Sequence, residues 1–207
     1  MAAAQTMLPA EDLAWAPRPL RLGYHRAMSQ CYVALLRGIN VGRAKRVAMA
    51  DLRLLVEGLG YTEVRSLLNS GNVVFRAAGT TAQDAAAAIE EALVLKVGVA
   101  ARVYVLGREE LAAIVAANPL LDVADNHARL MVFLLGDPAQ RERLAALAEQ
   151  DWGCERLALG ERAAYVWCPE GILDSAPAAA LGKQLGDGTT SRNWNTLMKL
   201  HAMCAEG

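Results

Sequence analysis

The chain has no excess of charge of either sign, since its 21 Lys and Arg residues stand against 22 Asp and Glu residues, for a formal net charge of -1. This balance argues against a global field that would draw the protein to nucleic acid or to an anionic membrane. Any basic site must therefore be local. No apolar run approaches the roughly 20 residues that span a bilayer, so we expect a soluble, cytoplasmic protein without a membrane partner.

The chain also lacks the residue spacings of a metal site. It has 4 Cys and 3 His, but no CxxC pair, HExxH segment or His/Cys cluster, so we expect no metal and no other cofactor. We expect all the cysteines to be reduced, packed thiols: Cys31, Cys154, Cys168 and Cys204. Cys154 and Cys168 flank an expected hairpin with a two-residue turn at Gly160-Glu161. That turn pairs Leu159 with Arg162 and places the two sulfurs on opposite faces, which disfavours a bridge.

No catalytic constellation is visible. The histidines are distant in sequence from any matched serine or cysteine nucleophile pattern, so the sequence leaves open whether the protein is an enzyme. Aromatic residues make up only 5% of the chain. No K/R-G-F/Y-G/A-F-V-x-F/Y segment is present to supply the stacking platform of an RNA-recognition motif. Sequence-specific RNA binding is therefore not favoured.

Residues 1–29 are rich in Ala and Pro and lack the continuous apolar core, about 7 to 15 residues long, of a secretory signal. We interpret this segment as a disordered N-terminal extension or as the product of a start assigned too early. Met28 lies just before the first expected strand and is the alternative start to Met1. Residues 30–107 then form a first expected subdomain, and residues 108–207 a linking helix and a second one.

The element pattern is β-α-β-β-α-β in the first subdomain. Its expected elements are a strand over 31–36, a helix over 49–59, a hairpin over 63–76 turning at Ser70-Gly71, an Ala-rich helix over 81–96 and a strand over 99–106. In the second, the first four elements recur over 129–135, 138–150, 155–159 and 162–167. Short and final helices follow near 177–185 and 193–204, and an eighth strand is weak at best. The pattern predicts an α+β fold of two ferredoxin-like subdomains with antiparallel sheets and a helical C-terminus.

The loop that leaves the first strand is the first candidate site. Five basic residues between Arg37 and Arg53 face one acidic residue, Asp51. A glycine-containing loop from strand to helix can present backbone N–H groups and a helix N-terminus to an anion, and arginine adds bidentate contacts. The P-loop signature is missing, because Gly42-Arg43-Ala44 stands where Gly-Lys-Ser/Thr is required. The alternative is that the glycines shape a turn and the basic side chains are solvated.

Two further segments are weaker candidates. At the start of the last helix, Ser191 or Asn193 can cap the helix and Arg192 can clamp an anion at its positive end. Ordinary capping beside a surface arginine explains the same residues. At the hairpin tip, turn chemistry explains the sequence Asn-Ser-Gly-Asn over 69–72. A hydrogen bond from Asn69 or Asn72 to a ligand is the alternative there.

Three motifs together resemble a bacterial domain-of-unknown-function family, number 1697. They are YVALLRGINVG over 32–42, LNSGNVVF over 68–75 and SRNWNT over 191–196. The resemblance extends from about residue 31 to residue 203. It implies two ferredoxin-like subdomains and a bacterial cytosolic setting, but it implies no activity, since none is assigned to the family. Members usually carry glycine where Arg43 stands.

Three hypotheses follow. The preferred one is a binding protein, or an enzyme of unknown reaction, that holds a small anionic or phosphate-bearing ligand through the basic loop. The expected ligand-binding residues are Arg37, Asn40, Arg43, Arg46, Asn72 and Arg192. The second is nonspecific nucleic-acid binding through the same basic stretch, which would depend steeply on salt. The third is a protein-interaction module without catalysis, in which an exposed sheet face or edge pairs with another chain.

Overall fold

The computed structural model describes residues 29–40, 46–137 and 139–206. Expectations for residues 1–28, including the alternative start at Met28, and for Arg43 lie outside the described residues. We call residues 30–107 the first half and residues 108–206 the second half. Within these residues, no helix has the length and apolar character needed to cross a membrane.

The first half contains β1 (Gln30–Leu36), α1 (Met49–Glu57), β2 (Thr62–Leu67), β3 (Asn72–Ala77), α2 (Ala82–Ala92) and β4 (Val103–Gly107). The second half begins with α3 (Arg108–Ala116), followed by β5 (Leu130–Leu135), α4 (Gln140–Ala148), β6 (Arg156–Leu159), β7 (Ala163–Trp167), α5 (Ala176–Leu185), β8 (Thr189–Asn193) and α6 (Trp194–Ala205). The strands form two four-stranded sheets, with the orders β2-β3-β1-β4 and β6-β7-β5-β8. All the pairings are antiparallel. The prediction of an α+β fold with antiparallel sheets is therefore confirmed.

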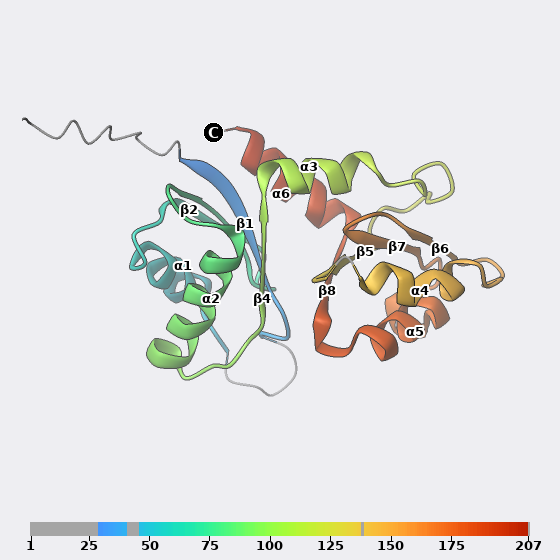
Figure 1. Cartoon of the computed structure of the whole chain (residues 1–207), viewed down its shortest axis with the longest axis horizontal. Coiled ribbons are helices and arrows are strands. Elements are labelled where there is room, and N and C mark those ends of the chain that lie inside the picture. Colours follow the sequence, from blue (N-terminus) through green and yellow to red (C-terminus); the bar gives the residue numbers. More distant parts are fainter. Residues whose placement is uncertain (1–28, 41–45, 138, 207) are drawn as a thin grey trace, which may run out of the picture.

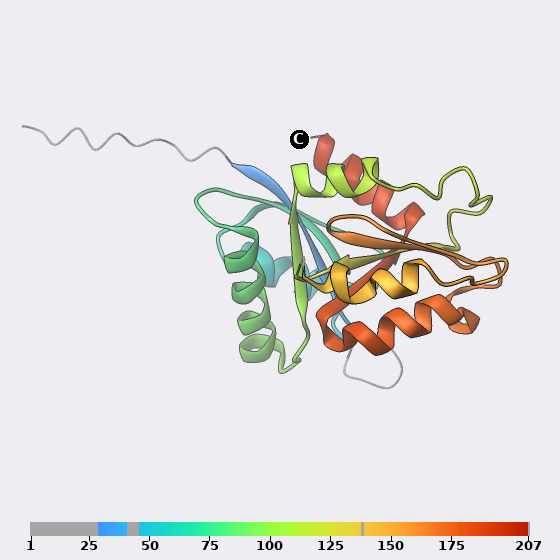
Figure 2. The ribbon, with the colours of Figure 1, turned by 45° about the vertical axis from the view of Figure 1, so that its right-hand side comes forward.

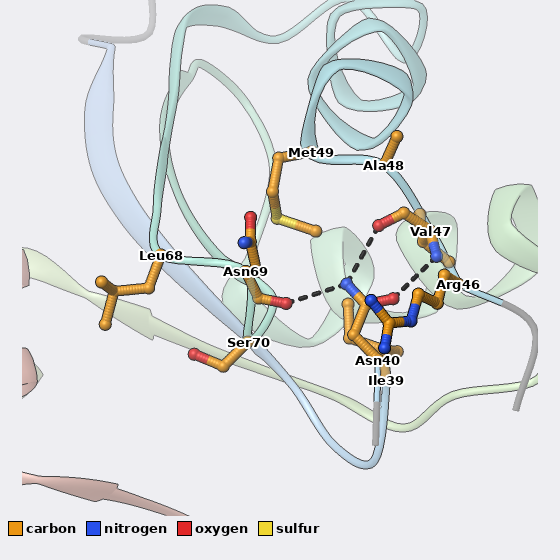
Figure 3. A pocket seen from close by; sticks show the side chains of 9 residues that line it. All are labelled: Ile39, Asn40, Arg46, Val47, Ala48, Met49, Leu68, Asn69 and Ser70. Atoms are coloured by element: carbon orange, nitrogen blue, oxygen red, sulfur yellow. Dashed lines mark hydrogen bonds between the residues drawn. The ribbon is translucent and has the colours of Figure 1, made fainter. Parts of the chain in front are cut away.

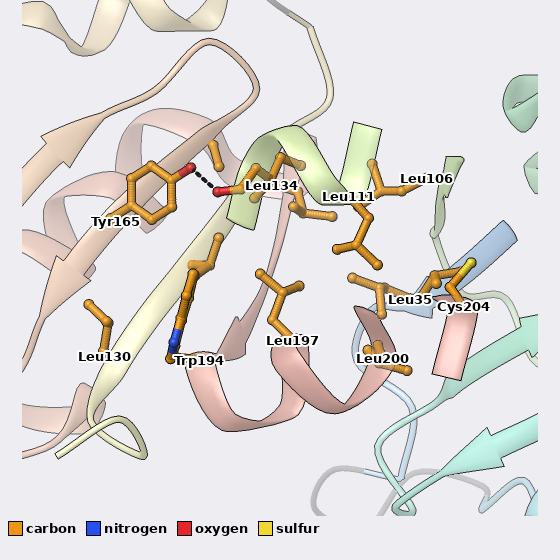
Figure 4. Packing of buried hydrophobic residues seen from close by; sticks show 14 of the residues in the cluster. Leu35, Leu106, Leu111, Leu130, Leu134, Tyr165, Trp194, Leu197, Leu200 and Cys204 are labelled. Carbon is orange, nitrogen blue, oxygen red and sulfur yellow. Dashed lines mark hydrogen bonds between the residues drawn. The ribbon is translucent and has the colours of Figure 1, made fainter. Parts of the chain in front are cut away.

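The helices divide into three layers around the two sheets (Figures 1 and 2). Helices α1 and α2 cover one face of the first sheet, and α4 and α5 cover one face of the second. Helices α3 and α6 lie side by side and pack against the remaining face of each sheet, in one hydrophobic cluster with residues of both halves (Figure 4). Helix α3 follows β4 directly, and α6 follows β8 directly. Both faces of each sheet are thus covered by helices of the same chain.

The eighth strand is a correction. The sequence made it weak at best, yet β8 pairs with β5 over five residues, from Thr189 opposite Leu135 to Asn193 opposite Met131. The glycines just before it weaken a purely local prediction, but Thr is β-branched and suits a strand. The Thr189 hydroxyl also donates to the Leu134 carbonyl at 2.7 Å. Strand β8 forms because it pairs with β5, which lies more than 50 positions earlier in the chain, and local sequence does not indicate such a pairing.

Both hairpins have longer turns than predicted. In the second hairpin Leu159 pairs with Ala164 rather than with Arg162, and the Gly160 N–H donates to the Ala163 carbonyl at 2.8 Å. In the first hairpin Leu67 pairs with Asn72, so residues 68–71 form the loop in place of a two-residue turn. The length of a hairpin loop depends on strand register as well as on composition. A stretch rich in Asn, Ser and Gly is compatible with a two-residue turn and with a four-residue loop.

The cysteines are a second correction. A disulfide joins Cys31 in β1 to Cys204 in the last turn of α6, with the two Cα atoms 5.8 Å apart. The prediction of a reduced thiol is therefore wrong for this pair, because it considered only neighbouring cysteines. Packing of α6 against the first sheet brings together two residues separated by 173 positions. Cys154 and Cys168 are free thiols, the first exposed and the second buried.

The buried hydroxyl of Tyr165 gives a first testable prediction. It donates to the Ile114 carbonyl at 2.6 Å and so ties β7 to α3 (Figure 4). Substitution Tyr165→Phe leaves that carbonyl unpaired, and we expect the free energy of unfolding to fall by about 1 kcal/mol in urea denaturation at pH 7.

The same variant has a signature at high pH. Burial raises the pKa of Tyr165 from 10.0 to about 12. The unfolded chain therefore loses this proton before the folded one does, and the wild-type protein should lose stability as pH rises from 10 towards 12. Tyr165→Phe should reduce that loss. An identical pH dependence in the two proteins would contradict the assignment.

Candidate functional site: the seam between the halves

Arg37 in the first half and Arg192 in the second each form hydrogen bonds to the other half. We call the region that contains these two arginines and their partners the seam. Arg37 follows β1 and reaches the segment between α5 and β8, where its Nη1 donates to the Gly186 carbonyl at 2.7 Å and to the Thr189 carbonyl. Its Nη2 pairs with Asp187 at 3.2 Å, although the Asp187 side chain is 87% exposed. Arg37 of the first half thus binds the turn that leads into β8, the outer strand of the second sheet.

Arg192 lies in β8 and reaches back to the first half. Its five N–H groups all donate to neutral oxygens: the Asn72 side chain, the Thr190 hydroxyl at 3.1 Å, and the carbonyls of Ser191 at 2.7 Å, Leu36 at 2.8 Å and Ser70 at 3.1 Å. Burial lowers the pKa of Arg192 to about 10 because it disfavours the charged form. Within the described residues, no carboxylate forms an ion pair with this guanidinium.

Asn40 fixes the base of the basic loop. It has a positive φ of 59°, which asparagine tolerates better than most residues. Its amide nitrogen donates to the Val47 carbonyl at 3.0 Å and to the Asn69 carbonyl at 2.8 Å, and its amide oxygen accepts from the Val47 N–H at 2.8 Å (Figure 3). Asn40 therefore joins the two ends of the loop and attaches them to the hairpin tip.

Asn72 holds the hairpin tip itself. Its side chain is completely buried, and its amide nitrogen donates to the Leu67 carbonyl at 2.9 Å and to the Ser70 hydroxyl at 3.0 Å. Its amide oxygen accepts from Arg192. Close approach of the hairpin requires Gly71, because a Cβ there would lie 2.6 Å from the Ile39 side chain. The side-chain N–H groups of Asn40 and Asn72 are thus used in hydrogen bonds that hold the loop and the hairpin tip in place.

A cavity of about 620 Å³ opens beside Asn40 at the start of α1 (Figure 3). We call it the basic-loop pocket, and its polar and backbone lining comes from Asn40, Arg46, Val47, Ala48, Asn69 and Ser70. Helix α1 begins after Ala48, which offers no side-chain cap, so N–H groups of its first turn are left for another partner. Arg46 is exposed, and neither a hydrogen bond nor an ion pair engages it within the described residues.

A second cavity, of about 300 Å³, lies between Arg37 and Arg192. We call it the arginine pocket, and it is lined mainly by Arg37, Gly38, Thr189, Thr190, Ser191 and Arg192. The predicted ligand-binding residues are therefore divided between two pockets. Asn40 and Arg46 line the first, Arg37 and Arg192 line the second, and Asn72 is buried where it contacts Arg192. Arg43 lies outside the described residues.

The sequence pointed to no role for Asp187, which pairs with Arg37 and lies in a glycine-rich stretch that no motif marks. Thr189 and Thr190 begin the second candidate segment, but they were not among the expected ligand-binding residues. An acidic residue between two glycines was the one available signal. The described residues also contain no group of three or more His, Cys, Asp or Glu side chains arranged to hold a metal ion.

Comparisons with known proteins place the chain in a family. None of the curated proteins matches it. Among solved structures, the conserved bacterial protein SP0830 from Streptococcus pneumoniae is similar, with a TM-score of 0.70 and 25% sequence identity over 86% of this chain and 99% of that chain. The model of a family of proteins of unknown function, DUF1697, matches residues 28–165, which include two of the three motifs. The resemblance inferred from those motifs is confirmed, and the chain belongs to the DUF1697 family.

Proposed function

We propose that the protein binds a small anionic or phosphate-bearing ligand in the basic-loop pocket. The observation that carries this proposal is that, among the described residues, Arg46 and the uncapped first turn of α1 both lack a partner. Arg46 lies three positions before Met49, the first residue of α1. Backbone N–H groups at a helix N-terminus and a guanidinium both favour oxyanions. The nine residues of α1 suffice for a helix dipole.

The rest of the pocket supports a ligand larger than a bare ion. Its volume of about 620 Å³ falls within the range typical of small-molecule sites. Apolar side chains, those of Ile39, Val47, Met49 and Leu68, line it together with the polar groups. This mixture favours a molecule with an anionic group at one end and an apolar or ring-containing body. Asn40 acts here by holding the loop rather than by contacting the ligand.

We further infer that each half is a ferredoxin-like subdomain. The element order β-α-β-β-α-β and the strand orders β2-β3-β1-β4 and β6-β7-β5-β8 support this assignment. The basic-loop pocket lies after β1, a central strand of the first sheet. The arginine pocket lies at the start of β8, an outer strand of the second sheet. The proposed site belongs to the loop that follows β1.

Substitution Arg46→Ala should weaken ligand binding about tenfold, because a charge-assisted contact of this kind contributes roughly 1.4 kcal/mol. Isothermal titration calorimetry measures the effect, once native mass spectrometry of gently purified protein has identified the bound molecule. Arg141→Ala is the matched control, because it removes the same charge from an exposed position in α4. Equal affinity of Arg46→Ala and Arg141→Ala would refute the proposed site.

The purification separates the remaining hypotheses. Nucleic acid that travels with the protein and dissociates steeply with salt would favour the nucleic-acid alternative. A mass in size-exclusion chromatography that rises with protein concentration would favour the protein-interaction module.

A further inference from the structure

The guanidinium of Arg192 is partly buried, and no carboxylate among the described residues forms an ion pair with it. Its five hydrogen bonds go to neutral oxygens, which orient the guanidinium but leave its charge uncancelled. Charges withdrawn from water are ordinarily paired in proteins, because their desolvation is unfavourable. At the same seam Asp187 pairs with Arg37 from a side chain that is mostly exposed to water, so it offers little compensation to Arg192. The seam carries positive charge that the described residues do not balance.

Arg37 and the start of β8 offer free donors beside that charge. Within the described part of the chain, the Arg37 Nε has no hydrogen bond, since its contacts to the second half are made by Nη1 and Nη2. The Thr190 hydroxyl accepts from Arg192 and keeps its own hydrogen to donate. Ser191 adds a second hydroxyl to the lining of the arginine pocket, and both sides of the seam contribute to it.

We infer that the arginine pocket is a second anion site, which takes one small oxyanion between Arg37 and Arg192 and thereby fastens the two halves together. The ligand chemistry is that of phosphate, sulfate or a carboxylate group. A cavity of about 300 Å³ is small, and its lining offers positive charge and hydroxyl donors. Direct contacts come from Arg37 and the hydroxyls, while Arg192 supplies the charge from its fixed position. This site is independent of the ligand proposed for the basic-loop pocket.

The test is thermal unfolding of the full chain with inorganic phosphate, measured against sodium chloride at matched ionic strength. An anion that binds only the folded protein raises Tm by mass action. We expect a rise of about 4 °C at a phosphate concentration far above Kd. Arg141→Ala, which removes the same charge from an exposed position in α4, should keep this rise. Arg37→Gln should lose at least half of it.

A second variant and a second readout keep the test decisive. If Arg37→Gln fails to fold, Thr190→Val removes a hydroxyl from the pocket with little change in shape and should reduce the rise in the same way. In nuclear magnetic resonance titrations, phosphate should shift the backbone amides of Gly38 and Ser191 more than that of Asn69. No rise in wild-type Tm, or an equal rise in the variant that folds, overturns the inference. Loss of the rise in Arg46→Ala would assign the phosphate to the basic-loop pocket and would also overturn it.

Discussion

Reduction of the disulfide between Cys31 and Cys204 is expected to lower the free energy of unfolding by about 4 kcal/mol. The cross-link joins residues 173 positions apart, so it restricts the unfolded chain over almost its whole described length. In the chain-entropy account, the stabilisation grows with the size of the closed loop. Guanidinium chloride denaturation with and without a thiol reductant measures the difference.

The control for reduction is Cys154→Ser, which removes an exposed free thiol and should leave the difference unchanged. Cys31→Ser should reproduce the reduced protein without any reductant. A thiol titration of unreduced, denatured protein should detect Cys154 and Cys168 alone, and all the cysteines should react after reduction. Reaction of all of them before reduction would contradict the disulfide.

The disulfide also bears on the expected cytoplasmic setting. Structural disulfides persist in oxidising surroundings and are uncommon where cellular thiols are kept reduced. The two sulfurs are carried by buried residues, with exposed fractions of 7% and 1%, so reductant reaches them poorly in the folded state. Comparison of the thiol count in rapidly quenched cells with that of the purified protein would show in which form the chain works.

The second large effect is expected for Leu197→Ala, which should lower the free energy of unfolding by about 3 kcal/mol. The Leu197 side chain is 1% exposed and lies in α6, within the cluster that both sheets share (Figure 4). Its removal costs transfer free energy and leaves a cavity among side chains held by two sheets. Urea denaturation followed by circular dichroism measures the loss.

Leu173→Ala is the control for this substitution, because Leu173 is 96% exposed. It should change the free energy of unfolding by less than about 0.5 kcal/mol. The shared cluster also predicts how Leu197→Ala unfolds. Since the same side chains support both halves, the transition should move as a whole without splitting into two. A variant in which one half unfolds at unchanged denaturant concentration would show that the halves are not coupled through α6.

Local patterns were sufficient for most elements of the fold. The apolar run at 31–36, the helical spacing from Met49 and the capping pair of Thr81 and Asp84 each predict a structure that the chain adopts. In the last case the Thr81 hydroxyl accepts from the Asp84 N–H at 3.1 Å. Such signals involve residues a few positions apart, and the backbone itself holds them in contact. The family motifs could also be recognised in the sequence, since each is a short contiguous segment.

What the sequence by itself determined was therefore the order of the elements apart from β8, the antiparallel α+β class and the family. The tertiary structure alone decided the pairing of β8 with β5, the disulfide to Cys204 and the distribution of the arginines over two pockets. The sequence offered Arg192 as an anion clamp or as a surface residue beside a helix cap, yet its partners include Leu36, Ser70 and Asn72 in the other half. Contacts between residues more than 100 positions apart depend on how the sheets and helices pack, and no local spacing encodes that packing.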